Sequence, residues 1–156
     1  MPEDYLDQSP DGEVRATELV MNLVRTTDEI YARIGRLLRP LGVSQAGGLV
    51  LGLLKDNGAM QPSELGDRLI VTRATVTGVL NSLETQGYVT RTEHPTDGRS
   101  LLVGLTAEGK RAIAKIRPMI HEAERDWLAG LSDIEKRRLI ELLHKTQDSL
   151  NASPES

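Results

Sequence analysis

The chain contains no cysteine among its 156 residues. This absence excludes disulfide bonds, thiolate metal sites and oxidation sensors that depend on cysteine. Its three histidines, His94, His121 and His144, do not lie three or four residues from one another. A histidine metal site would therefore need side chains brought together from distant parts of the fold, and we expect neither a metal nor a cofactor.

Long apolar runs are also missing. No stretch approaches the roughly 20 apolar residues that cross a bilayer. The first 12 residues are polar and acidic, without the basic and then apolar segments of a signal peptide. We therefore expect no membrane partner and a cytoplasmic protein. With 27% charged and 38% apolar residues, the composition is typical of one globular domain with a real core.

The sequence carries no motif of an enzyme active site. It has no glycine-rich phosphate loop, no nucleophile paired with a base and no ligands at metal spacing. Glu122 and Glu124 beside His121 resemble acid–base machinery, but on an amphipathic helix they are typical of the solvated side. We expect no catalytic residue and no enzymatic activity.

Positive charge is scarce, and its position is informative. The net charge is −4, yet residues 1–30 alone hold eight acidic residues against two arginines, a balance of −6. Residues 68–101 hold four arginines against three acidic residues, a balance of +1. A nucleic-acid site in the second segment would have a low non-specific affinity for the phosphate backbone. Its binding would depend on contacts with bases in the grooves.

The apolar residues recur at helical spacing through most of the chain. Ser44 is the predicted N-cap of the second helix, Gly58 is predicted to end it, and Gly87 is predicted to supply a left-handed turn after the fourth helix. The predicted helices cover residues 13–38, 44–57, 61–69, 71–87, 106–120 and 132–150. The first and the last are longer and more apolar than packing within one small domain requires, which predicts a partner. The pair Gly47-Gly48 indicates either close backbone packing or a nearby ligand.

Residues 88–93 and 100–105 are rich in strand formers and flank the turn sequence Pro95-Thr-Asp-Gly98. They predict a β-hairpin. A short helix, a tight turn, a second helix with a polar start and a hairpin form a winged helix-turn-helix, which places its second helix in a major groove. The predicted fold is mainly α with a small β-wing.

The candidate DNA contacts lie on the second of these helices and beside it. Thr72 is an N-cap whose neighbouring amides suit phosphate. Arg73, Thr75, Thr77 and Asn81 lie off the buried face. Gly78, between them, either lets the backbone approach the bases or removes one base contact.

Two further candidates flank this helix. Arg99, at the tip of the hairpin, would probe the minor groove. Ser63 either donates a hydrogen bond to a phosphate or supports the start of its own helix.

Three phrases occur in order: Leu83-Glu-Thr-Gln-Gly-Tyr-Val-Thr-Arg91, Asp97-Gly-Arg99, and Val103-Gly-Leu-Thr-Ala-Glu-Gly109. With the flanking helices, residues 13–150 resemble the multiple-antibiotic-resistance regulator (MarR) family. The resemblance implies a single domain over 13–150, with a winged helix-turn-helix at 44–106, dimerisation helices at 13–40 and 107–150, and tails at 1–12 and 151–156. It also implies a homodimer on a pseudo-palindromic operator in double-stranded DNA, most often as a repressor.

The resemblance further implies that Asp97 holds a wing arginine in place, either Arg99 or Arg91; the alternative is a plain turn residue ahead of Gly98. Family members usually respond to a small molecule, here expected to be aromatic or phenolic. Its pocket would lie between the first, second and fifth helices, although residues of this kind are more often core. The candidate lining residues are Ile30, Tyr31, Ile34, Val43, Gly47, Leu51 and Met119.

Two alternatives within DNA-related function stay open. The protein is either a ligand-responsive regulator or an architectural regulator without an effector. A third reading is an interaction scaffold that keeps the winged-helix shape without binding DNA. The low basic charge favours the scaffold, whereas the Asp97 and Arg99 pattern of the wing argues against it.

Overall fold

The computed structural model of the chain describes residues 13–69, 72–97 and 100–152. The chain divides into two compact units, residues 1–119 and 120–156. The sequence led us to expect a single domain over 13–150. That boundary stays a prediction, and each unit is described by itself; the one complete helix of the second unit has no buried residue.

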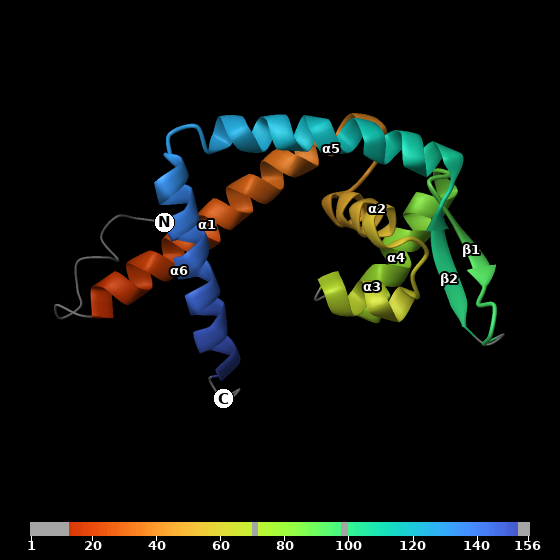
Figure 1. The fold of residues 1–156 in the computed structure, drawn as a ribbon, viewed down its shortest axis with the longest axis horizontal. Coiled ribbons are helices and arrows are strands. Elements are labelled where there is room, and N and C mark those ends of the chain that lie inside the picture. Colours follow the sequence, from red (N-terminus) through yellow and green to blue (C-terminus); the bar gives the residue numbers. More distant parts are fainter. Residues whose placement is uncertain (1–12, 70–71, 98–99, 153–156) are drawn as a thin grey trace. The chain divides into compact units, whose positions relative to one another are not determined.

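The elements follow the predicted order (Figure 1). The first unit contains α1 (Glu13–Leu38), the 3-10 helix η2 (Arg39–Leu41), α2 (Gln45–Asn57), α3 (Pro62–Leu69), α4 (Arg73–Thr85), β1 (Val89–Glu93), β2 (Leu101–Leu105) and most of α5 (Ala107–Trp127). The second unit contains the end of α5 and α6 (Asp133–Ala152). The observed order confirms the predicted mainly α fold with a two-stranded wing.

Local capping explains where the helices begin and end. The Ser44 hydroxyl oxygen accepts a hydrogen bond from the amide of Gly47 at 3.0 Å and begins α2. Gly58 and Gly87 have φ angles of +80° and +74°, a region that favours glycine, and follow the ends of α2 and α4. These three positions confirm the sequence-based predictions.

The core of the first unit is apolar and closely packed. Its buried side chains include Leu51 of α2, Leu65 of α3, Leu80 of α4 and Ile113 of α5. A Cβ atom at Gly48 would lie 2.8 Å from Cδ1 of Leu38. The Gly47-Gly48 pair therefore serves close packing, one of the two readings that the sequence left open.

The wing is an antiparallel hairpin in which Arg91 pairs with Val103. The amide of His94 donates to the carbonyl oxygen of Ser100 at 2.9 Å and extends the ladder by one rung. The sequence did not reveal that Met60 pairs with Val103, through hydrogen bonds of 3.0 and 2.8 Å. A single paired residue has no periodicity that a sequence pattern could detect.

Thr106 joins the wing to α4 and α5. Its hydroxyl donates to the carbonyl oxygen of Gly87 at 2.5 Å and accepts from the amide of Gly109 at 3.0 Å. Its own amide donates to the carbonyl oxygen of Tyr88 at 3.1 Å. The base of the wing is thus held by backbone and hydroxyl hydrogen bonds.

A separate ion pair joins α5 to α2. Arg117 of α5 lies 2.8 Å from Asp56, the penultimate residue of α2.

Within the described ranges, no single helix is long and apolar enough to cross a membrane. Two helices, Ala16–Leu41 and Gln45–Asn57, meet that criterion only together and across a bend of 78°. The apolar character of the second is explained by its place in the core, where Val50, Leu51 and Leu54 are buried.

Candidate nucleic-acid interface

Helices α3 and α4 pack against each other and against the hairpin (Figure 1). Helix α4 buries Val76, Leu80 and Leu83 and leaves its other side in solvent. The four residues that the sequence placed off the buried face are all exposed. They are Arg73, Thr75, Thr77 and Asn81.

The first turn of α4 is capped by threonine hydroxyls. Thr72 has an extended backbone, and its hydroxyl oxygen accepts from the amide of Thr75 at 3.2 Å. The hydroxyls of Thr72 and Thr75 lie 2.9 Å apart. One turn later, the Thr77 hydroxyl donates to the carbonyl oxygen of Arg73 at 2.9 Å. The predicted N-cap role of Thr72 is confirmed, and all three hydroxyls have partners within the helix.

Arg91 links the wing to the second half of α4. Its Nη2 donates to Oδ1 of Asn81 at 2.7 Å, and its Nη1 lies 2.8 Å from Oε2 of Glu84. Only 26% of the Arg91 side chain is exposed. Both terminal nitrogens of Arg91 therefore contact residues of α4.

Glu84 is a contact residue of the wing that the sequence pattern did not indicate. Glu84 and Arg91 are seven residues apart, across a helix end and a glycine turn, so no helical or strand periodicity relates them. Their contact depends on how the hairpin folds back on α4.

The start of α3 is capped from within. The carboxylate of Glu64 accepts a hydrogen bond from the amide of Gln61 at 2.8 Å. Ser63 is exposed, and within the part of the chain that the structure describes its hydroxyl forms no hydrogen bond. The hydrogen bond at the start of α3 is therefore made by Glu64, and a phosphate contact of Ser63 stays a prediction.

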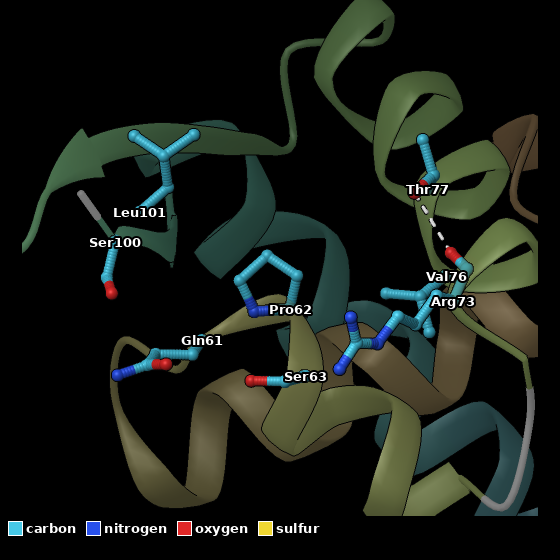
Figure 2. A pocket seen from close by; sticks show the side chains of 8 residues that line it. All are labelled: Gln61, Pro62, Ser63, Arg73, Val76, Thr77, Ser100 and Leu101. Carbon is cyan, nitrogen blue, oxygen red and sulfur yellow. Dashed lines mark hydrogen bonds between the residues drawn. The ribbon is translucent and has the colours of Figure 1, made fainter.

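A cavity of about 360 Å³ lies where α3, α4 and β2 meet. Figure 2 shows Arg73 and Ser63 projecting into it from the starts of α4 and α3. No acidic residue is among the eight that line it. They are Gln61, Pro62, Ser63, Arg73, Val76, Thr77, Ser100 and Leu101. One guanidinium and several hydroxyl and amide groups without a carboxylate suit a phosphodiester.

At the tip of the hairpin, Asp97 acts as a turn residue. Its Oδ2 accepts from the hydroxyl of Ser100 at 2.6 Å, and its carbonyl oxygen accepts from the amide of Ser100 at 2.9 Å. Arg99 lies outside the described residues. Its pairing with Asp97 and its reach toward a minor groove stay predictions.

The residues expected to line an effector pocket fall into two groups. Val43, Gly47 and Leu51 are buried in the core, where a Cβ at Gly47 would lie 3.3 Å from Cδ2 of Leu83. The other four lie nearer the surface. Ile30, Ile34 and Met119 are partly buried, and Tyr31 is 49% exposed. The cavity at α3, α4 and β2 includes none of the seven. Among the described residues, no three histidine, aspartate or glutamate side chains could together hold a metal ion.

An exposed second helix, a capped first turn and a hairpin tied to that helix define a winged helix-turn-helix, a class of DNA-binding fold. The MarR family model matches residues 41–100. The uncharacterised HTH-type transcriptional regulator YkoM of Bacillus subtilis is 31% identical over 132 residues, which cover 82% of this chain and 86% of YkoM. The chain belongs to the MarR family of transcription regulators.

Other relatives are also regulators rather than enzymes. The HTH-type transcriptional repressor YetL of Bacillus subtilis is 34% identical over 104 residues, or 65% of this chain. The chain spans only 62% of the length of YetL.

Two solved structures share the fold at 24% identity. One is a mutant of MarR from Escherichia coli complexed with operator DNA, with a TM-score of 0.79 and coverage of 88% of this chain and 99% of that one. The other is BpsR of Bordetella bronchiseptica, whose DNA binding is regulated by 6-hydroxynicotinic acid, with a TM-score of 0.75 and coverage of 83% and 98%.

Proposed function

We propose that this MarR-family regulator acts as a homodimer that reads a pseudo-palindromic operator in double-stranded DNA and represses transcription. One observation carries the proposal: α6 and α1 each expose large apolar side chains in the single chain. An exposed apolar surface of this extent is typical of a protein–protein interface.

Helix α6 provides the clearer case. It has no buried residue, although it carries Ile134, Ile140 and Leu150, which are 75%, 53% and 69% exposed. In α1, Leu19, Val20 and Val24 are each more than half exposed. Large apolar side chains do not stabilise a helix that stays in water. Full burial of each one would contribute a favourable free energy of about 1.5–3 kcal/mol.

A second copy of the chain is the simplest cover for these faces. Homodimers with two-fold symmetry are the commonest oligomers, and a two-fold axis relates two copies of α4. Two such helices read half-sites about one turn of DNA apart, on inverted sequences. The capped and exposed start of α4, the cavity beside it and the attached wing support DNA as the ligand of each copy.

Control by an effector is the finer part of the proposal. It is supported by BpsR, whose DNA binding responds to a small aromatic acid. The repressor role is supported by YetL. We propose a small aromatic or phenolic effector that binds between α1, α2 and α5 and releases the operator.

Selection of random duplex DNA by the purified protein, followed by sequencing, tests the operator. We expect an inverted repeat with half-site centres about 10 base pairs apart. Enrichment of a single, unrepeated site would contradict the dimeric reading. Enrichment of nothing at all would favour an interaction scaffold.

The selected duplex then serves to test the effector. A panel of aromatic acids and phenols should include a compound that raises the unfolding temperature by mass action and displaces the duplex. A compound that stabilises the protein without displacing DNA would argue against release. A panel without any stabilising compound would favour an effector-independent regulator.

A further inference from the structure

We infer that α4 reads its half-site mainly through the C5-methyl groups of thymine, with Thr77 as the specificity-determining residue. The inference rests on the proposed function, because it requires α4 to lie in a major groove. It adds which chemical feature of the bases the helix detects.

The hydroxyl of Thr77 is directed into its own helix. It donates its proton to the carbonyl oxygen of Arg73 at 2.9 Å. Figure 2 shows the hydroxyl turned toward that carbonyl and the methyl group turned away from it. The residue is exposed. The group that Thr77 offers to a groove is therefore its methyl.

Thr75 resembles Thr77 in this respect. Its hydroxyl lies 2.9 Å from that of Thr72, whose oxygen also accepts from the Thr75 amide. Both hydroxyls are thus used in the cap of α4. Thr75 is exposed, so its methyl group is also open to a ligand on this side of α4.

Asn81 is the one amide among the candidate contacts on α4, and the wing restricts it. Bidentate recognition of adenine needs both the oxygen and the nitrogen of an asparagine amide. Here Oδ1 of Asn81 accepts from Arg91 at 2.7 Å, and Arg91 is also paired with Glu84. Gly78 adds no side chain, and among the described residues no atom beyond its chain neighbours and its own helical backbone lies within 4 Å of the place where its Cβ would be.

These contacts leave methyl groups as the main features that the middle of α4 presents. In the major groove, thymine alone among the four bases displays a methyl group, and threonine methyls are suited to contact it. The bare backbone at Gly78 allows this surface to approach the base edges closely. We therefore expect each half-site to place a thymine against Thr77.

Replacement of thymine by deoxyuridine in the selected operator tests this directly, because it removes only the methyl group. Each thymine would be replaced in turn, in one half-site and then in both, and duplex affinity measured with the wild-type protein. At one position we expect affinity to fall about fourfold for one half-site and about fifteenfold for both. Equal affinity for the thymine and uracil operators would overturn the inference.

Two variants separate the methyl from the hydroxyl. Thr77→Ser keeps the hydrogen bond to Arg73 and removes the methyl, whereas Thr77→Val keeps a methyl and removes the hydroxyl. We expect the serine variant to bind both operators equally and the valine variant to keep the preference for thymine. A serine variant that keeps the preference for thymine, or a valine variant that loses it, would overturn the inference.

The comparison of thymine and uracil operators uses only the wild-type protein. Its result therefore does not depend on whether the Thr77 variants fold. A wild-type protein without any specific duplex binding would overturn the proposed function together with this inference. A protein that binds its operator with the same affinity whether or not the thymine methyl groups are present would overturn only the inference.

Discussion

A Cβ atom at Gly109 would lie 2.0 Å from the backbone carbonyl oxygen of Tyr88. The same carbonyl oxygen accepts a hydrogen bond from the amide of Thr106 at 3.1 Å. The first turn of α5 therefore rests on the backbone that leads from α4 into the wing. Backbone cannot move aside as a flexible side chain can, so only glycine fits at this position.

Gly109→Ala should consequently destabilise the protein by about 2 kcal/mol or more, because forced overpacking outweighs the better helix propensity of alanine. Urea unfolding at a fixed protein concentration measures the change. The same substitution at Gly78 is the matched control, since among the described residues its Cβ would meet no atom within 4 Å beyond its chain neighbours and its own helical backbone. Gly78→Ala should stabilise by up to about 1 kcal/mol. Equal effects at the two sites would refute the packing argument.

The link from Arg91 to Asn81 and Glu84 gives a second prediction. Arg91→Met keeps an unbranched apolar stem but removes the guanidinium and both contacts, and should lower the free energy of unfolding by about 1 kcal/mol. Operator affinity should fall as the wing loosens from α4. In the Arg91→Met background, Glu84→Gln should lower the free energy of unfolding by less than it does in the wild type. A double-mutant cycle measures this difference.

Arg111→Met is the control for that cycle. Arg111 pairs with Glu108 within α5, and 67% of its side chain is exposed. Such exposed pairs contribute little, so we expect a change within about 0.5 kcal/mol. A similar loss in both arginine variants would show that the contact to α4 has no special role.

The features predictable from the sequence are those set by neighbouring residues. The caps at Ser44 and Thr72 and the left-handed turn at Gly87 are confirmed, because each depends on a few adjacent positions. The partners of Arg91 could not be predicted, since tertiary packing alone brings residues from α4 and β1 together. For the same reason, the sequence placed Asn81 on the exposed face but did not reveal that a wing arginine holds its amide oxygen.

Arg99 at the wing tip gives a third prediction, one that rests on the sequence pattern. Arg99→Ala should weaken specific operator binding by about 1–3 kcal/mol, because a minor-groove contact is lost. Competition between operator and unrelated duplex measures the specific part. Arg138→Ala, which removes the same charge from α6, should leave that ratio unchanged. An unaltered ratio in the Arg99 variant would contradict the wing assignment.

The exposed face of α6 gives a fourth prediction. Ile140→Glu should raise the dissociation constant of the dimer at least 100-fold, since a two-fold axis places the substitution in the interface twice. Sedimentation velocity across a concentration series measures the constant. Lys145→Glu changes the charge of the same helix at an exposed position, five residues after Ile140 and thus away from its face, and should dimerise nearly as well as the wild type. A dimer unaffected by both substitutions would place the interface elsewhere.

The carboxylate of Glu135 gives a fifth prediction, that acid weakens the cap at the start of α6. Its Oε2 accepts from the amide and the hydroxyl of Ser132 at 2.8 and 2.7 Å, and the Ser132 hydroxyl oxygen accepts from the Glu135 amide at 3.3 Å. This is a capping box. The side-chain and then the backbone hydrogen bond from Ser132 favour the charged carboxylate, so the pKa of Glu135 is lowered from its ordinary value of 4.5.

Because the folded pKa lies below the unfolded one, the stabilisation is fully present above about pH 4.5 and is lost as the pH falls through the lowered folded value. NMR titration should show the Glu135 carboxyl and the Ser132 amide titrating together, below 4.5. Glu135→Gln should abolish the titration of the Ser132 amide, whereas Glu141→Gln, further along α6, should leave it unchanged. A Glu135 carboxyl that titrates at 4.5 or above would mean that the capping box does not persist in solution.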